Sequence, residues 1–527
     1  MTLPAWLPLT SNGRTVLYTT LALAVPVVLV HYRRLAGSRK PRHPPSPVSF
    51  PVLGHLLYLS STSVHLDFMR ISEQLQSDII YLKIFGENMI ILNSVQAASD
   101  ILEKRSATYS DRLCPPFGKD PTLFDLSDNL AMLGCNDTWR HQRCMLNKWL
   151  NVRAVSQFDG LLEHQTTLLL QCLLSQSEHP RPFEMVKQEF FFAMGSAMLK
   201  LGYGYQLESK DDRVFQEAQL VVTRIVKSLN PTAFAVNLFP FLTHAPSWFP
   251  GTGWKRIARE WREHKEKVYK SLYEWTKSQT AGTAEPSVLG YLLQDEDLAP
   301  ELGPEEIEKR LKELSIGLYG GGTETSSGTL MKFVAAMVLN PEVQAKAQEE
   351  IDSVIGSDTL PKMFDRNRLP YVQNLISEVL RWHTVSPTGL PHVCSQDDTY
   401  RGYDIEKGTV IMFNTWAMSR DKEIYKDPEL FNPDRFLDPS VPRLPVFGWG
   451  RRICPGLHFA ESTLFIIIAS LLATFTFSAK KDTEGREIVP DIRDAPDPLA
   501  LTLQPFEFEL KPRSELHRKL ITTNDTL

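Results

Sequence analysis

The chain has 527 residues, of which 43% are hydrophobic and 23% charged, a composition typical of a globular protein with a large core. Its formal net charge of -5 at pH 7 excludes the basic character of a nucleic-acid-binding protein, so no nucleic acid is expected as a partner. The six cysteines form no C-x-x-C pair and no regular spacing, which argues against a disulfide scaffold and against a zinc site.

An uncharged run of sixteen residues, 15–30, follows Arg14 and precedes a cluster of basic residues. With Tyr and Arg side chains reaching the interface, it is long enough to cross a bilayer core of ~30 Å. A cleaved signal peptide and a buried core helix are the alternatives, but a signal peptide carries its charge before the apolar run. The sequence predicts a short lumenal N-terminus over 1–14 and a single-pass transmembrane anchor over 15–32, in the endoplasmic reticulum membrane.

The basic cluster predicts that the rest of the chain is cytosolic. Residues 33–51 are basic and rich in proline, which cannot continue a helix and favours a stiff extended connector. This hinge is the one clear boundary in the sequence. We therefore expect a single cytosolic catalytic domain over residues 52–527.

Beyond the hinge, hydrophobic periodicity predicts mostly helices with a little sheet. Residues 79–93 predict a hairpin that turns at Gly86-Glu87-Asn88, and residues 400–414 have similar strand character. Helices are predicted over 158–175, 183–201, 211–229, 253–278, 304–339, 341–355 and 370–383. The apolar stretch 463–477 is too short for a membrane span and predicts a buried core helix. The expected fold class is mainly α with a small β-sheet region.

The segment FGWGRRICPG, residues 447–456, places one thiol, Cys454, among glycines and cations. A thiolate that binds a metal is kept deprotonated by nearby cations and by the free amides of a helix N-terminus. Arg451 and Arg452 offer the cations, and Pro455-Gly456 precede a long apolar stretch. A buried structural cysteine in a glycine-rich turn is the alternative interpretation.

The glycines of this segment favour a large, flat ligand. Gly448, Gly450 and Gly456 let the backbone approach where a side chain would collide, and Phe447 can pack against the sulfur or the ligand. The pattern F-x-x-G-x-R-x-C-x-G resembles the haem-binding signature of the cytochrome P-450 superfamily. That resemblance implies haem b (iron protoporphyrin IX), with Cys454 as the axial thiolate on the iron, which favours cleavage of the O–O bond.

A second matching motif is E-x-x-R, formed by Glu378 and Arg381, whose spacing puts both on one helix face. Alone, the pair predicts a solvent-exposed ion pair. In the family it belongs to a buried charge cluster completed by an arginine, which the segment FNPDRF offers as Arg435. Asp434 stands where the family often has glutamate. The resemblance implies a structural role for this cluster.

The third motif, GLYGGGTETSSGT over residues 317–329, puts four glycines into a predicted helix, at a cost of ~1 kcal/mol each relative to alanine. Thr325 can turn its hydroxyl back to the carbonyl of Gly321, which would distort the helix and open a groove. In the family this groove binds O₂, and the resemblance implies that Glu324 and Thr325 deliver protons. A close helix crossing with a surface acid is the alternative interpretation.

The fourth motif is WRHQR, in which Trp139 and Arg143 lie one helical turn apart. An indole N–H and a guanidinium can bind the two haem propionates. The resemblance adds Arg452 and His392 as further propionate partners.

The resemblance covers nearly the whole chain and implies the cytochrome P-450 fold, with haem between the glycine-rich helix and the cysteine loop. The residues after Cys454 are too few for a flavin domain, so we expect electrons from NADPH through a separate membrane-bound flavoprotein reductase. Arg140, Lys148 and Arg451 could attract such an acidic partner.

Two hypotheses remain for the function. The first is a monooxygenase that hydroxylates or epoxidises an apolar small molecule. The second is a haem-thiolate isomerase, dehydratase or haem-binding protein that does not activate O₂. The pair of Glu324 and Thr325 favours the first, because non-oxygenating members tend to lose it.

Several apolar segments are expected to line the substrate pocket or its entrance. They are residues 113–134, 230–250, 385–391 and the turn from Leu499 to Leu501. The stretch 230–250, rich in Phe, Trp and Pro, can also dip into the bilayer. The residues that fill these motifs resemble those of fungal members of the family that act on secondary metabolites such as terpenoids or polyketides.

Overall fold

The computed structural model describes residues 41–60, 63–280, 287–295, 302–495 and 500–523. The predicted membrane anchor over 15–32 and the first part of the hinge lie outside these residues. Within them, one helix, Leu457–Thr474, is long and apolar enough to cross a membrane, and 78% of it is buried inside the protein. That helix, α16, is therefore part of the core.

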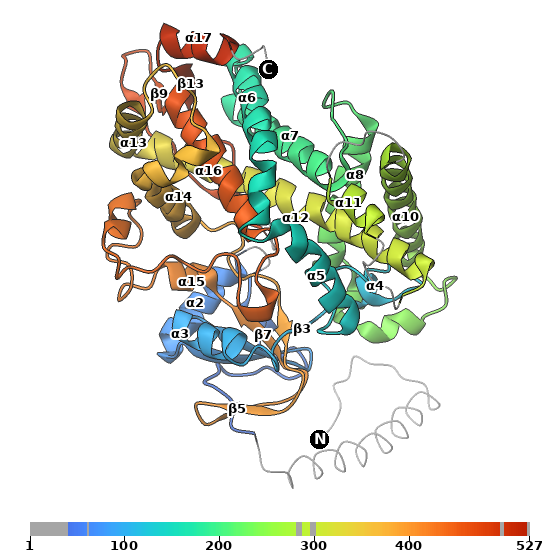
Figure 1. The fold of residues 1–527 in the computed structure, drawn as a ribbon. Helices are drawn as coiled ribbons and strands as arrows, with labels where there is room; N and C mark the ends of the chain where they lie inside the picture. Colours follow the sequence, from blue (N-terminus) through green and yellow to red (C-terminus); the bar gives the residue numbers. More distant parts are fainter. Residues whose placement is uncertain (1–40, 61–62, 281–286, 296–301, 496–499, 524–527) are drawn as a thin grey trace, which may run out of the picture.

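Helices dominate the fold, as predicted (Figure 1). They are α2 Val64–Leu75, α3 Val95–Ala98, α4 Pro116–Lys119, α5 Asp137–Leu150, α6 Asp159–Ser175, α7 Pro182–Tyr203, α8 Arg213–Leu229, α9 Ala235–Leu238, α10 Gly253–Thr280, α11 Val288–Gln294, α12 Pro304–Leu339, α13 Pro341–Val354, α14 Pro370–Trp382, α15 Thr415–Ser419, α16 Leu457–Thr474 and α17 Glu515–Thr523. Helix α12 crosses the middle of the molecule and packs along α7 and against α16.

Short polar residues explain where two helices begin, and a glycine explains where a third ends. The Asn136 side chain accepts a hydrogen bond from the Trp139 amide at 2.9 Å and caps α5. Asp212 caps α8 in the same way, accepting from the Val214 amide at 2.7 Å. Gly204 ends α7 in the left-handed conformation, with φ +75°. These caps position α5 and α7, which flank α12.

The main sheet has five strands in the order β1-β2-β7-β4-β3. The strands are β1 Ile79–Ile84, β2 Glu87–Leu92, β3 Asp111–Arg112, β4 His392–Val393 and β7 Val410–Phe413, and β2 and β7 are parallel while the other neighbours are antiparallel. Alternate residues of β1 and β2 enter two different cores: Ile80 and Ile91 pack with α2, whereas Ile79 and Ile90 pack with α3. Helices therefore cover the sheet on both faces.

The hairpin turn lies one residue earlier than the sequence suggested. Phe85 and Gly86 form the turn, with φ +48° and +95°, and Glu87 and Asn88 already belong to β2. Two-residue hairpin loops require positive φ, because only then does the turn match the twist of the strands. The prediction of a turn over Gly86-Glu87-Asn88 was wrong in this detail.

The predicted core helix over 463–477 also needs correction. Helix α16 begins at Leu457 and ends at Thr474, and Phe475–Ser478 is strand β8, paired with β13 Glu509–Pro512. Phe475 and Phe477 alternate with half-buried residues, a strand pattern that an uninterrupted apolar run conceals.

The remaining strands form small two-stranded sheets. They are β5 Asp398–Tyr400 with β6 Tyr403–Ile405, β9 Lys480–Lys481 with β10 Glu487–Ile488, and β11 Asp494–Ala495 with β12 Thr502–Leu503. The predicted strand region 400–414 is thus divided between two sheets, since β6 pairs with β5 and β7 joins the main sheet.

Candidate functional site

The loop before α16 folds sharply so that its backbone passes close to neighbouring segments. Gly448 and Gly450 have φ +86° and +51°, and a Cβ atom on Gly450 would lie 2.4 Å from the Leu102 carbonyl oxygen. The Cys454 amide donates to the Phe447 carbonyl at 2.8 Å, which closes the loop. Gly456 is the N-cap residue of α16. The predicted open backbone around this thiol is therefore present, and glycine is required at position 450 by both conformation and space.

The Cys454 thiol is half-buried, and its cationic neighbour is not the one the sequence suggested. Burial raises the pKa of this thiol, while the Gly456 amide and the Arg143 guanidinium act in the opposite direction. Arg143 donates to the Ile453 carbonyl at 2.8 Å and so lies beside the loop. The Arg452 guanidinium turns away to other partners, and Arg451 is exposed. A half-buried thiolate here fits a position where a metal cation compensates its charge.

Two arginines lie next to each other here: Arg452 of the loop, which is buried, and Arg112, which is half-buried. Arg452 donates to the Ser110 carbonyl at 2.7 Å and to the Leu133 carbonyl at 2.5 Å. Its guanidinium carbon lies 4.4 Å from the centroid of the Trp139 ring. Arg112 donates to the carbonyls of Leu390 and Pro391, and its Nε has no hydrogen-bond partner.

Neighbouring positive charges lower the pKa of both Arg112 and His392. Burial, followed by repulsion from Arg452, lowers the pKa of Arg112 to about 9. Burial and Arg112 hold the pKa of His392 well below its ordinary value, and His392 Nδ1 lies 2.7 Å from the Tyr109 carbonyl oxygen. Among the described residues, no carboxylate forms an ion pair with Arg112 or Arg452. Buried charges require a partner, so this cluster fits a ligand that carries carboxylates, as haem does.

Arg112 was missed by the sequence-based prediction. It belongs to the two-residue strand β3 and stands opposite His392 of β4 in the register of the sheet. So short a strand has no periodicity, and the two residues are 280 positions apart (392 − 112). Only the pairing shows that they face one site.

One face of α12 is accessible although most of the helix is buried. Gly317, Gly321, Glu324 and Thr325 are exposed, and their spacing places them on one side of the helix. Thr325 Oγ1 donates to the Gly321 carbonyl at 2.7 Å, as predicted. Helix α12 is continuous from Pro304 to Leu339, so this bond does not break the helix. Open space, not a break in the helix, makes room beside Thr325.

The glycines of α12 serve two purposes. A Cβ atom on Gly317 or Gly321 would meet nothing within 4 Å, whereas on Gly320 it would lie 3.1 Å from Val222 of α8. On Gly322 it would overlap Met198 of α7 at 2.2 Å. Gly320 and Gly322 thus allow the close helix crossing of the alternative interpretation. Gly317 and Gly321 lie on the accessible face instead.

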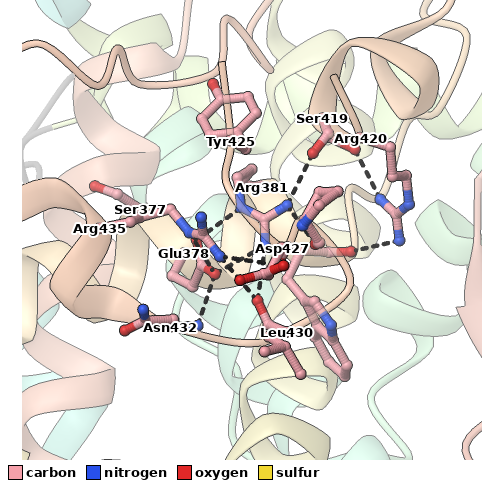
Figure 2. Close-up of polar contacts among 12 residues, drawn as sticks. Ser377, Glu378, Arg381, Ser419, Arg420, Tyr425, Asp427, Leu430, Asn432 and Arg435 are labelled. Carbon is pink, nitrogen blue, oxygen red and sulfur yellow. Dashed lines mark hydrogen bonds and ion pairs between the residues drawn. The ribbon is translucent and has the colours of Figure 1, made fainter. Parts of the chain in front are cut away.

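Glu378 and Arg381 lie at the centre of a fully buried charge cluster (Figure 2). Arg381 donates to both carboxylate oxygens of Glu378, at 2.7 and 2.8 Å, and Arg435 Nε lies 3.0 and 3.1 Å from the same two atoms. The Asn432 amide donates to Glu378 at 2.8 Å. Asp434 is outside the cluster and pairs with Lys346 at 2.6 Å on the surface, so its departure from the family pattern leaves the cluster intact.

The three cations expected to attract an acidic partner contribute less charge than the sequence suggested. Arg140 pairs with Asp137, and Lys148 pairs with Asp295 at 2.8 Å. Arg451 is exposed on the cysteine loop. Two of the three charges are thus compensated by neighbouring carboxylates.

Comparison with known proteins decides the family. A sequence model described as Cytochrome P450 matches residues 44–510. The chain belongs to the cytochrome P450 family. Cytochrome P450 monooxygenase COX1 of Coprinopsis cinerea is 34% identical over 519 residues, which cover 95% of this chain and 98% of that protein. Cytochrome P450 monooxygenase 208 of Postia placenta is 37% identical over 508 residues, which cover 95% and 96%. Cytochrome P450 monooxygenase claR of Ampulloclitocybe clavipes is 34% identical over 488 residues, which cover 91% and 88%.

The protein is therefore a cytochrome P450 monooxygenase, similar along nearly its whole length to fungal enzymes of that name. Membership in the family implies a haem group, O₂, a redox partner and a small-molecule substrate. Among the described residues, Arg112 and Arg452 form no ion pair with a carboxylate, which is consistent with binding of this cofactor.

Proposed function

We propose that this cytochrome P450 binds haem b through Cys454 and inserts one oxygen atom from O₂ into a C–H or C=C bond of an apolar small molecule. The observation that carries the proposal is the pair of cations Arg112 and Arg452 at the cysteine loop. Among the described residues neither forms an ion pair with a carboxylate, and haem propionates would supply one.

The residues of the site divide into three groups by what they would do to the cofactor. Cys454 would coordinate the iron, and Phe447, Gly448 and Gly456 would surround its sulfur. Arg452, Arg112, Trp139, Arg143 and His392 would hold the propionates. When bound, a haem thiolate supplies activation of dioxygen.

Glu324 and Thr325 are proposed to deliver protons to the oxygen-binding space beside α12. The bond from Thr325 Oγ1 to the Gly321 carbonyl leaves the hydroxyl oxygen available to accept a hydrogen bond from a ligand. Glu324 exposes its carboxyl group on the same helix face. Both groups on one accessible face favour oxygen activation over the isomerase, dehydratase or haem-binding alternatives.

Electrons would come from an NADPH-dependent flavoprotein reductase, and substrate would enter from the endoplasmic reticulum membrane. Exposed aromatic side chains support the membrane contact: Phe241, Trp248 and Phe249 are 68%, 81% and 53% exposed. They lie in the stretch 230–250, predicted from sequence to enter the bilayer. Since the relatives are fungal enzymes, a secondary metabolite such as a terpenoid or polyketide is the proposed substrate class.

The test is a carbon monoxide difference spectrum of the dithionite-reduced protein. Wild type and Cys144→Ala, which removes an exposed free thiol, are expected to give the red-shifted Soret band of a thiolate ligand. Cys454→Ala is expected to lose that band. A band that persists in Cys454→Ala, or that is missing from haem-loaded wild type, would overturn the assignment of Cys454.

The oxygenation step is tested by turnover. Wild type with reductase, NADPH and apolar candidate substrates in ¹⁸O₂ is expected to give a product heavier by one ¹⁸O atom. An isomer or a dehydrated product formed without O₂ consumption would support the non-oxygenating alternative.

A further inference from the structure

A second buried polar cluster lies at the end of the accessible face of α12. Lys332 is seven residues after Thr325, nearly two helical turns farther on the same side of α12. Its side chain is fully buried, at 0% exposed, and Nζ donates to the Thr384 carbonyl at 3.2 Å. A buried lysine is costly, and apolar residues of similar volume often serve stability better. Its presence therefore calls for a role other than stability.

The same cluster connects a C-terminal hairpin to the residues that follow α14. His383 Nε2 lies 3.0 Å from Oδ1 of Asp494, the first residue of β11. Strand β11 pairs with β12, Thr502–Leu503. The ion-pair distance joins two segments that are distant in sequence, so it fixes where the hairpin sits.

The hairpin reaches the proposed oxygen-binding space through Val385. The Leu501 amide donates to the Val385 carbonyl at 2.8 Å. A Cβ atom on Gly328 would lie 3.8 Å from a methyl group of Val385, so this side chain rests on α12 one turn after Thr325. Any movement of the hairpin would therefore move Val385 and change the space beside Thr325.

The charges of the cluster come from five elements. Burial lowers the pKa of Lys332 to about 7, and the Asp494 carboxylate opposes this effect. Burial also lowers the pKa of His383, and the nearby Asp494 carboxylate opposes this effect. His65 of α2 and Arg420, which follows α15, face the cluster from the other side, and burial lowers the pKa of His65 to about 4. Lys332 and Asp494 are joined through two adjacent residues, since Lys332 contacts Thr384 and Asp494 contacts His383.

We propose that Lys332, His383 and Asp494 form a polar latch that holds the β11–β12 hairpin against the residues after α14 and so sets the size of the substrate space beside Thr325. Lys332 and Asp494 are positioning residues, which act on substrate choice through Val385 and Leu501. This role rests on the proposed function, since it concerns the pocket of that site.

Hydrogen exchange of the full-length protein in detergent micelles tests the latch without turnover. Asp494→Ala is expected to accelerate exchange of the amides of residues 501–503 at least tenfold, and Lys332→Met to accelerate it less. The double variant should show less than the product of the single effects, because both changes release the same segment, His383 and Thr384. Lys309→Met, on α12 and paired with Asp128, is the matched control and should leave these amides unchanged.

Exchange within twofold of wild type in Asp494→Ala would overturn the latch. If Asp494→Ala does not fold, Asp494→Asn, which keeps an acceptor for His383 but removes the charge, takes its place with the same expectation and the same contrary result.

Two ligands of different size test the effect on the pocket. We expect the ratio of dissociation constants for imidazole and 4-phenylimidazole, from their spectral shifts, to change at least fivefold in Asp494→Ala and not in Lys309→Met. An unchanged ratio would overturn the link between hairpin and pocket. Absence of the thiolate-type carbon monoxide band in wild type would refute ligation by Cys454, while the exchange measurement would still decide the latch.

Discussion

Replacing Glu378 with glutamine should be among the most destabilising single changes in this protein. The carboxylate of Glu378 accepts hydrogen bonds from Arg381, from Arg435 and from the Asn432 amide, and both Glu378 and Arg381 are 0% exposed. Glutamine keeps the shape but removes the charge, which leaves two buried guanidinium groups without an anion. Breaking a buried ion pair in this way costs about 3–5 kcal/mol.

That cost is a large fraction of the ~5–15 kcal/mol by which folded domains are usually stable. We expect Glu378→Gln to lower the free energy of unfolding, measured by urea denaturation followed by circular dichroism, by about 3–5 kcal/mol. Asp434→Asn is the matched control, because Asp434 pairs with Lys346 on the surface, where such pairs contribute about 0–1 kcal/mol. If Glu378→Gln were within about 1 kcal/mol of this control, the reasoning about the buried cluster would be refuted.

Three further predictions concern the site and the buried lysine. Arg112→Met should keep the fold but release haem to apomyoglobin about 10–100-fold faster, since a charge-assisted hydrogen bond contributes ~1.5–3 kcal/mol; unchanged release would exclude Arg112 as a propionate partner. Thr325→Ala should keep the carbon monoxide band while product formation falls at least tenfold and hydrogen peroxide release rises; full coupling in the variant would argue against proton delivery by Thr325. The pKa of Lys332 is about 7 in the folded protein and higher in the unfolded chain. At pH values between the two, the unfolded chain keeps a proton on Lys332 that the folded protein has lost, so the free energy of unfolding rises with pH. The unfolding free energy of wild type relative to Lys332→Met should thus increase by about 1.4 kcal/mol per pH unit from about pH 8 to 10, and a pH-independent difference would contradict the burial of this charge.

Local patterns in the sequence were sufficient for the helices and for the cysteine loop. Helical periodicity located α8, which buries one face, and also α7 and α12, which are buried on most sides. The three-residue spacing of Glu378 and Arg381 placed both on one side of α14, which is a property of the helix itself. The strand β8 was missed because its alternation is hidden at the end of an apolar run.

What the tertiary structure decided depends on contacts between segments far apart in the chain. Arg112 faces His392 only because two short strands pair, and Arg143, not Arg451 or Arg452, is the cation that acts on the Cys454 thiol. Lys332 contacts the Thr384 carbonyl in the same way. Local rules describe neighbours along a helix or strand, whereas these pairings arise when the hydrophobic cores bring separate elements together. The sequence by itself therefore determined the chemistry of the cysteine loop, and only the fold decided which charges surround it.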